Sequence, residues 1–255
     1  MSDLPIAPGF RLDGLRALVT GASRGIGRAA AVALAAAGAE VVLAARALDE
    51  SEATAAALRA EGHAATAIAL DVTDRAAVRA AVAAQKPFDI LVNNAGTNIR
   101  EPFLEVRDHS FDALIDLNLR AAFTVAQAVA QGMAAAGRGG AIINMSSVNG
   151  HVAGINRSVY TATKHALEGL TKGMVAELGP HGIRVNTICP GFVETPLTKG
   201  LLADETFRIS QSRRMPMGRI LTVEDLMGAV VFLASPASAM VSGCSLVIDG
   251  GFLVQ

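Results

Sequence analysis

Cysteine is scarce in this chain of 255 residues. Only Cys189 and Cys244 are present, with neither a Cys-x-x-Cys spacing nor a histidine cluster beside them. This pattern argues against a disulfide scaffold and against a zinc site, and it favours a reducing, cytoplasmic compartment. The five histidines also lack any metal-ligand spacing, so we expect no metal site.

An excess of charge is absent as well. Lys and Arg number 22 and Asp and Glu 23, a formal net charge of -1, which gives no reason to expect a nucleic-acid partner. Charged residues make up 18% and hydrophobic residues 51%, which excludes a disordered chain. The longest apolar run, Ala29–Ala37, is far shorter than the roughly 20 residues needed to span a bilayer, so no membrane partner is expected. Met1–Leu15 shows no cationic region followed by an apolar one, and we expect no secretory signal there.

Short β-branched apolar runs alternate with longer Ala- and Leu-rich segments. The predicted strands are Arg16–Thr20, Glu40–Ala44, Ala64–Leu70, Phe88–Val92, Ala141–Met145, Ile183–Ile188 and Ser245–Ile248. The predicted helices are Gly25–Ala37, Asp49–Glu61, Asp74–Ala84, Ser110–Ala136, Val159–Leu178 and Val223–Ala234, with Asp74 and Thr222 as N-caps. Nearly continuous apolar strands are typical of a parallel sheet covered on both faces. The chain is therefore predicted to be α/β, a single doubly wound Rossmann-type domain over residues 1–255 with a seven-stranded parallel sheet.

One long irregular stretch, residues 190–218, interrupts the alternation with prolines and glycines. A loop of this length in a compact domain is usually functional, so we expect a substrate-binding lid here. Ligands of such sheets bind beyond the carboxyl ends of the strands, where the strand order reverses.

The first predicted strand runs directly into a glycine-rich turn, Thr20-Gly21-Ala22-Ser23-Arg24-Gly25-Ile26-Gly27, and then into a helix. Glycines here allow a tight turn and close approach of the backbone to a pyrophosphate. The phosphates would then lie at the helix N-terminus, where free N–H groups and the helix dipole favour negative charge.

Together with this turn, two further motifs resemble the short-chain dehydrogenase/reductase family. They are Asn93-Asn94-Ala95-Gly96 after the fourth strand, and Tyr160-x-x-x-Lys164 thirteen residues beyond Ser147. Asn118, Pro190-Gly191 and Asp249-Gly250-Gly251 match in the same order, so the resemblance covers nearly the whole chain. It implies an oxidoreductase that moves a hydride between a nicotinamide cofactor and an alcohol or ketone carbon.

The chemistry of Tyr160 and Lys164 also follows from the residues. Four residues apart on a helix, they lie on one face as neighbours. A free phenol has a pKa near 10, and a nearby ammonium favours the phenolate, so we expect a pKa lowered by about 2–3 units. Tyr160 would then serve as a general acid/base near neutral pH. Ser147, just past the fifth strand, can hydrogen-bond the oxygen whose proton is exchanged.

The resemblance assigns roles to particular positions. The implied catalytic residues are Asn118, Ser147, Tyr160 and Lys164, with the serine polarising the carbonyl and the asparagine ordering a proton-relay water. The implied cofactor-binding residues are Gly21, Ser23, Arg24, Gly25, Ile26, Gly27, Arg46, Asp71, Val72, Asn93, Ala95, Gly96, Tyr160, Lys164, Pro190, Gly191, Val193 and Thr195.

The end of the second strand predicts the preferred cofactor. An acidic residue there would bind the ribose 2′-hydroxyl of NAD, whereas a nearby Arg suits the 2′-phosphate of NADP. Ala45 stands where family members that select NAD carry the acid, Arg46 follows it, and Arg24 is a second candidate phosphate ligand. We expect NADP to be preferred, with NAD also possible.

The substrate is expected to be a small, polyhydroxylated molecule. The loop after Gly96 resembles the gluconate 5-dehydrogenase-like branch of the family, which has an Arg beside the substrate carboxylate at the position of Arg100. Arg100, Ser147, Asn149, His151 and Tyr160 are the candidate substrate-binding residues. A 3-oxoacyl thioester bound to a carrier protein is the alternative substrate, and a catalytically silent dinucleotide-binding regulator is a remote alternative.

The resemblance also implies a homotetramer. Its subunits would meet through the helices Ser110–Ala136 and Val159–Leu178 and through the C-terminal strand.

Overall fold

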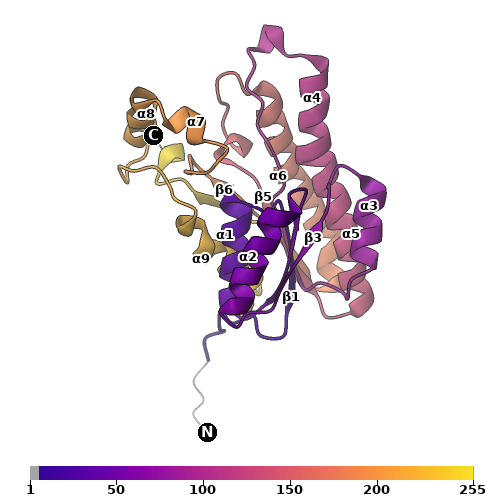
Figure 1. The fold of residues 1–255 in the computed structure, drawn as a ribbon. Helices are drawn as coiled ribbons and strands as arrows, with labels where there is room; N and C mark the ends of the chain where they lie inside the picture. Colours follow the sequence, from indigo (N-terminus) through magenta and orange to yellow (C-terminus); the bar gives the residue numbers. More distant parts are fainter. Residues whose placement is uncertain (1–5, 255) are drawn as a thin grey trace.

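The computed structural model describes residues 6–254; the first five residues of the stretch Met1–Leu15 lie outside the described part. Its strands are β1 (Arg16–Thr20), β2 (Glu40–Ala45), β3 (Ala65–Ala69), β4 (Ile90–Asn93), β5 (Gly140–Met145), β6 (Ile183–Pro190) and β7 (Ser245–Ile248). They form one sheet in the order β3-β2-β1-β4-β5-β6-β7, and every neighbouring pair is parallel (Figure 1). The predicted fold class and seven-stranded parallel sheet are confirmed.

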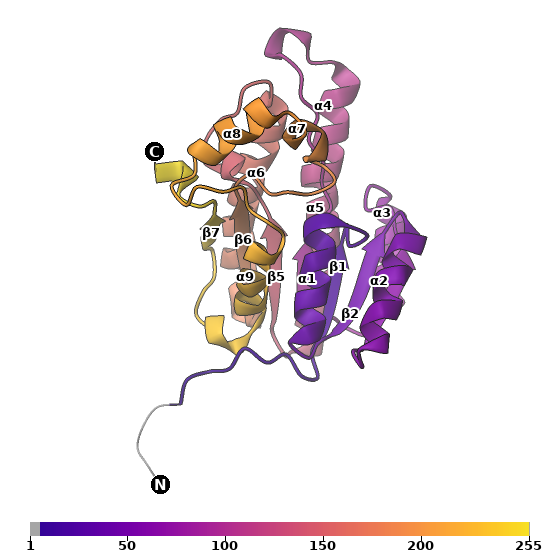
Figure 2. The same cartoon turned by 60° about the vertical axis from the view of Figure 1, so that its left-hand side comes forward.

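Helices cover both faces of this sheet (Figure 2). One face carries α1 (Gly25–Ala36), α2 (Leu48–Ala60) and α9 (Glu224–Ala234). The other carries α3 (Arg75–Ala83), α4 (Asp108–Ile115), α5 (Ala121–Ala136) and α6 (Ser158–Leu178). Successive residues of a strand therefore enter different cores, as in β1, where Ala17 and Val19 pack beneath α1 and Leu18 packs beneath α5. This two-sided burial is why the strands are continuously apolar.

The order of the strands places the glycine-rich turn beside the Asn93–Gly96 segment. Strands β1 and β4 are neighbours in the sheet, although two strands and three helices separate them in the sequence. The chain leaves β1 for α1 on one face and leaves β4 for α4 on the other. A crevice opens where the connections diverge in this way, so the carboxyl ends of β1 and β4 define the binding edge.

The predicted helix Ser110–Ala136 has a different form from the one expected. It begins at Asp108 and contains a π-helical turn at Asp116–Arg120 between α4 and α5. The helical spacing of apolar residues predicted the long helix. It did not predict the π-helical turn, because a single wide turn hardly changes the spacing of the apolar residues. Wide turns of this kind are frequent at functional sites, and this one carries Asn118.

The two predicted N-caps have opposite outcomes. Asp74 caps α3 and accepts from the N–H groups of Ala76 and Ala77, both at 3.0 Å, as predicted. The prediction for Thr222 is wrong, because α9 begins at Glu224 and its N-cap residue, Val223, makes no side-chain cap. The Thr222 side chain accepts no helix N–H here. Instead, the Thr222 N–H donates to the Asp225 carboxylate in the first turn of α9, at 2.9 Å.

The irregular stretch between β6 and α9 contains two short helices. These are α7 (Lys199–Leu202) and α8 (Glu205–Arg213), and Asp204 caps α8. Both lie beyond the carboxyl ends of the strands (Figure 2). Thr195 contacts the glycine-rich turn: a Cβ added to Gly25 would be 3.6 Å from the Thr195 Cβ. The stretch therefore borders the crevice.

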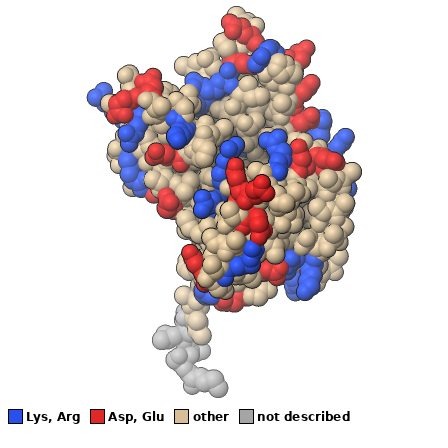
Figure 3. All heavy atoms as spheres, viewed as in Figure 1, with Lys and Arg blue, Asp and Glu red and all other residues tan. Residues whose placement is uncertain are grey.

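Within residues 6–254, one helical stretch, Asp108–Ala136, is long and apolar enough to cross a membrane by composition. Half of the most apolar 18-residue segment of this stretch is buried inside the protein, as in the core helix of a folded domain. On the face shown in Figure 3, basic and acidic side chains are interspersed.

Candidate active site

The turn after β1 has the backbone that its glycines predict. Gly21 and Gly25 have φ angles of +64° and +56°, in the left-handed region that side chains disfavour. A Cβ on Gly27 would lie 2.3 Å from the Gly21 carbonyl oxygen, so only glycine fits. The N-cap of α1, Arg24, makes no side-chain cap, and the first turn contains no acid. The free N–H groups of α1 are suited to a phosphate.

Residues after β4 fasten this turn from the neighbouring strand. Asn94 donates through Nδ2 to the carbonyls of Thr20 (3.0 Å) and Gly21 (3.2 Å). The Thr20 hydroxyl accepts in turn from the N–H groups of Asn94 and Ala95. Asn93 is buried and donates to the Ala122 carbonyl (2.7 Å) and to Asn144 Oδ1 (3.2 Å), which links the central strands to α5. The role of Asn94 was not predicted, because it depends on a partner 74 residues away.

A pocket of about 660 Å³ lies along this edge of the sheet. Of the predicted cofactor-binding residues, those that line it are Gly21, Ser23, Arg24, Gly25, Ile26, Arg46, Asp71, Val72, Ala95, Gly96, Tyr160, Lys164 and Thr195. Lining residues absent from the prediction are Ala45, Ala47, Glu50, Leu70, Thr73, Asn94, Thr97, Leu117, Met145, Ser146, Pro196 and Leu197. The lining of the pocket extends from Arg46, which follows β2, past the ends of β1 and β4 to Met145 at the end of β5, so the pocket suits a ligand that spans several strands.

Several predicted cofactor residues support the pocket from behind without lining it. Gly27 and Asn93 hold the turn and the central strands as described above. Gly191 packs on the chain near β7, where an added Cβ would be 2.9 Å from the Asp249 Cα, and Pro190 ends β6. Val193 is buried, and its carbonyl accepts the Thr198 hydroxyl at 2.6 Å.

One end of the pocket carries two unpaired guanidinium groups. Neither Arg24 nor Arg46 forms an ion pair with any residue between 6 and 254. Asp71 accepts from the Thr73 hydroxyl (2.7 Å) and N–H (2.9 Å), and these bonds, with a smaller contribution from the Arg46 charge, lower its pKa. Glu50 also lines this end.

Tyr160 and Lys164 lie one turn apart on α6 and both line the other end of the pocket. The Lys164 Nζ atom is 5.7 Å from the centre of the Tyr160 ring and donates to the Met145 carbonyl at 2.9 Å. Burial lowers the pKa of Lys164 to about 8. The predicted adjacency of the two side chains is present.

The expected direction of the Tyr160 pKa is wrong for this arrangement. Burial raises the pKa of the phenol, and the Ser147 hydroxyl and the Arg157 charge lower it by smaller amounts. Because the Lys164 ammonium is held by a main-chain carbonyl, its charge is not directed at the phenol oxygen. Tyr160 is therefore a protonated acid at neutral pH here, ready to donate a proton.

Ser147 lies directly after β5, and its Oγ accepts from the Asn149 N–H at 3.1 Å while also interacting with the Tyr160 phenol. Asn149 is buried, and its Nδ2 donates to Thr161 Oγ1 at 3.4 Å. Asn149 thus links Ser147 to α6. His151 is exposed, and its Nε2 is 2.8 Å from Ser245 Oγ, at the start of β7. Substrate binding by Asn149 and His151 stays a prediction.

The π-helical turn brings Asn118 to the same place. Asn118 Oδ1 accepts from the Thr97 N–H and its Nδ2 donates to the Thr97 carbonyl, both at 2.9 Å. A Cβ on Gly96 would be 3.1 Å from Asn118 Oδ1 and 3.8 Å from Lys164 Nζ, so both polar groups flank this glycine. The four predicted catalytic side chains therefore come together from three separate segments: the π-helical turn, the end of β5 and helix α6.

Arg100 is exposed in the loop that follows β4, and it has no ion-pair partner among the described residues. The neighbouring Glu101 is paired instead with Arg107 and accepts from the Ser110 hydroxyl at 3.0 Å. Arg100 is therefore a free cation close to the site.

A parallel doubly wound sheet with a glycine-rich phosphate turn, and a Ser-Tyr-Lys-Asn cluster at the far end of its pocket, defines a dinucleotide-dependent oxidoreductase. Comparison with known proteins agrees. Residues 21–253 match the family described as Enoyl-(Acyl carrier protein) reductase. The chain is 46% identical over 250 residues to gluconate 5-dehydrogenase from Gluconobacter oxydans (strain 621H), covering 96% of this chain and 97% of that protein. It is 44% identical over 243 residues to L-xylulose reductase from Mesocricetus auratus, with 95% and 98% covered.

Among solved structures, the chain is similar to the gluconate 5-dehydrogenase from Burkholderia cenocepacia J2315 in complex with NADP and tartrate. The TM-score is 0.93 at 44% identity, and the match covers 96% of this chain and 98% of that one. The chain belongs to the short-chain dehydrogenase/reductase family. It is an enzyme of the class that acts on CH–OH groups.

Proposed function

We propose that this protein is an NADP-dependent oxidoreductase that interconverts a secondary alcohol and a ketone on a sugar acid or polyol, in the manner of gluconate 5-dehydrogenase. The observation that carries the proposal is the pocket itself: Tyr160 and Lys164 line one end, and the glycine-rich turn with Arg24 and Arg46 lines the other. A dinucleotide has the length and charge to lie between these ends.

The cofactor, when bound, supplies or accepts the hydride. In reduction, Tyr160 donates its phenolic proton to the carbonyl oxygen of the substrate, and in oxidation it takes that proton back. Ser147 donates a hydrogen bond to the same oxygen and polarises the carbonyl. Lys164 lies one turn from Tyr160 on α6, and Lys164 Nζ and Asn118 Oδ1 both lie against Gly96. After reduction Tyr160 takes a replacement proton from solvent, and after oxidation it releases one to solvent, with Asn118 ordering the water that relays it.

NADP is favoured over NAD by the charges at the other end. Ala45 at the end of β2 offers no carboxylate to a ribose 2′-hydroxyl, and Arg46 follows it at the pocket wall. Because Arg24 and Arg46 have no acidic partner among residues 6–254, both are available for a 2′-phosphate. The Burkholderia cenocepacia relative holds NADP in its structure.

A polyhydroxylated substrate is supported by the polar surroundings of Tyr160. Ser147, Arg100 and Arg157 supply donors there, and the two relatives named above act on a sugar acid and on a sugar. An acyl chain would require an apolar mouth. All four catalytic side chains are assembled, which disfavours the catalytically silent regulator.

We further propose a homotetramer in the cytoplasm. Phe111 on α4 and Phe123 on α5 are large apolar side chains that are 47% and 45% exposed. Val247 on the outer strand β7 is partly exposed as well. These surfaces match the helices and the strand predicted to join the subunits. Both cysteines are free, in keeping with a reducing compartment.

The test is an absorbance assay at 340 nm with NADPH, NADH and their oxidised forms. The substrate panel contains D-gluconate and 5-keto-D-gluconate, the uncharged polyol D-glucitol, L-xylulose, and a 3-oxoacyl thioester. We expect the highest kcat/KM with NADP(H) and a sugar acid or polyol. Activity confined to the 3-oxoacyl thioester would replace this proposal with the acyl reductase, and binding of NADPH without turnover of any carbonyl would support the regulator.

A further inference from the structure

Arg157, which immediately precedes α6 and lies three residues before Tyr160, has an unusual environment. Its Nε atom is buried and has no hydrogen-bond partner among the described residues. Its side chain runs closely past Gly154, where an added Cβ would be 3.1 Å from the Arg157 Cδ. An arginine nitrogen removed from water without an acceptor is costly, so such groups are usually completed by a ligand.

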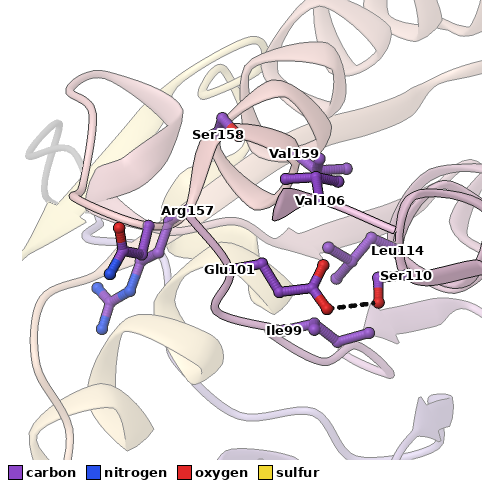
Figure 4. A pocket seen from close by; sticks show the side chains of 9 residues that line it. Ile99, Glu101, Val106, Ser110, Leu114, Arg157, Ser158 and Val159 are labelled. Carbon is purple, nitrogen blue, oxygen red and sulfur yellow. Dashed lines mark hydrogen bonds between the residues drawn. The ribbon is translucent and has the colours of Figure 1, made fainter. Parts of the chain in front are cut away.

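The obvious carboxylate nearby is already committed elsewhere. Glu101 and Arg157 line the same small pocket, yet Glu101 points towards Ser110 while Arg157 extends away from it (Figure 4). The Glu101 carboxylate accepts from Arg107 Nε at 2.7 Å and from Ser110 Oγ at 3.0 Å. In the part of the chain that the structure describes, Arg157 forms no ion pair.

A second free guanidinium lies close by. The Glu101 N–H donates to the Asn156 carbonyl at 3.1 Å, which joins the loop that carries Arg100 to the residue before Arg157. Burial lowers the pKa of Arg157, and the charge of Arg100 lowers it further. The Arg157 charge also acts on the Tyr160 phenol. An anion bound by both guanidinium groups would relieve the repulsion between them.

The same guanidinium contacts the segment between β6 and α9. The Arg157 Cζ atom is 5.8 Å from the centre of the Phe192 ring, within the range of a cation–π contact. The Phe192 ring packs edge-on against Phe207, with centres 5.4 Å apart and an interplanar angle of 67°. Phe207 belongs to α8, so a row of three side chains runs from the site to this helix.

We propose that Arg157 is a specificity-determining residue that binds the substrate carboxylate together with Arg100. When the carboxylate is bound, the contacts of Arg157 with Phe192, and of Phe192 with Phe207, order helix α8. The substrate class is then a polyhydroxylated carboxylate, an aldonate or keto-aldonate, and not an uncharged polyol. This inference rests on the proposed function, because it names the substrate class of the same site. The substrate carboxylate would neutralise the charges of Arg100 and Arg157. It would hold the Arg157 guanidinium over the Phe192 ring and so order α8 against the substrate.

The first test compares two substrates with the same carbon number, D-gluconate and D-glucitol, in Arg157→Gln. We expect KM for gluconate to rise by about tenfold or more, because hydrogen bonds to charged groups are the strong ones. KM for glucitol should change by less than about twofold. The matched control is Arg208→Gln, which removes an equal charge from the exposed face of α8, where Arg208 pairs with Glu205. Equal effects of Arg157→Gln on both substrates would overturn the proposal.

The second test measures hydrogen exchange across residues 196–214 in the complex with NADP⁺, with and without gluconate. We expect gluconate to slow exchange in α8 of the wild type but not in Arg157→Gln. Phe207→Leu leaves both arginines in place and should lose most of this protection while KM for gluconate rises less than in Arg157→Gln. Protection of α8 that survives both substitutions would overturn the proposed link.

The two proposals fail differently. If the wild type turns over neither substrate, the proposed function is wrong. If the wild type prefers gluconate and only Arg100→Ala removes that preference, the proposed function stands and the role of Arg157 is refuted.

Discussion

The Lys164 ammonium donates to the Met145 carbonyl at 2.9 Å and lies 5.7 Å from the centre of the Tyr160 ring. A main-chain oxygen at the end of β5 therefore holds the charge that would otherwise favour the phenolate. Since burial also raises the pKa of Tyr160, the phenol keeps its proton in this arrangement. In this arrangement the phenol is available as a proton donor.

Tyr160→Phe removes this proton and leaves the shape of the site nearly unchanged. We expect kcat to fall by roughly 10²–10⁴-fold, the usual contribution of a general acid/base, while the Kd for NADPH stays within about twofold. Fluorescence titration of NADPH measures the binding and steady-state kinetics measure the turnover. Near-normal turnover with any good substrate would exclude Tyr160 as the proton donor.

Lys164→Met should abolish turnover and yet stabilise the protein without cofactor. The pKa of Lys164 falls from 10.5 to about 8 because its ammonium is buried, so the charged form costs stability in the native state at every pH below 8. We expect the variant to gain on the order of 1–3 kcal/mol in the free energy of unfolding at pH 7.

The pH dependence checks the cause of this gain. Between pH 8 and 10.5 the unfolded chain holds the Lys164 proton and the native state does not, so the wild type gains stability relative to Lys164→Met as the pH rises. Urea unfolding at pH 7, 9 and 10.5 measures this difference. A gap that stays constant over that range would show that the ammonium is not the cause.

Arg24→Ala and Arg46→Ala should each lower kcat/KM for NADPH by about 10–100-fold, because each loses a charge-assisted hydrogen bond to phosphate. The values for NADH should change much less. Ala45→Asp adds the missing carboxylate at the end of β2 and should turn the preference towards NADH. The ratio of the two kcat/KM values is the measurement, and a wild-type preference for NADH that Arg46→Ala leaves intact would contradict the assignment.

Asp74→Ala removes the cap of α3 and should lower the free energy of unfolding by about 1 kcal/mol, without changing activity. Asp204→Ala removes the equivalent cap of α8, which lies outside the two cores, and should raise hydrogen exchange in residues 205–213 with little change in Tm. Thermal melting of the two variants side by side distinguishes a cap that supports a helix packed on the sheet from one that supports only α8. Equal losses of Tm would contradict this division.

Local features were decided by the sequence itself. The strands were predictable because both faces of a parallel sheet are covered, which makes runs such as Ala17, Leu18 and Val19 apolar throughout. The glycine-rich turn and the pairing of Tyr160 with Lys164 were predictable for a similar reason: a glycine's positive φ and a four-residue helical spacing depend only on neighbours along the chain.

The tertiary structure alone decided the remaining features. The partner of Lys164 is a carbonyl 19 residues away. Burial of the phenol in the folded protein gives the Tyr160 pKa the opposite direction from the one expected. Asn94 acts on a turn 74 residues away, and the ring of His151 is held by Ser245, 94 residues further on. The sequence does not predict that the Arg157 Nε is buried without an acceptor. The Glu101 carboxylate is paired with Arg107, and this pairing is visible only in the folded protein. Charges and polar atoms act over a few ångströms, and only the packing of α6 and the loop after β4 against the sheet determines which of them meet.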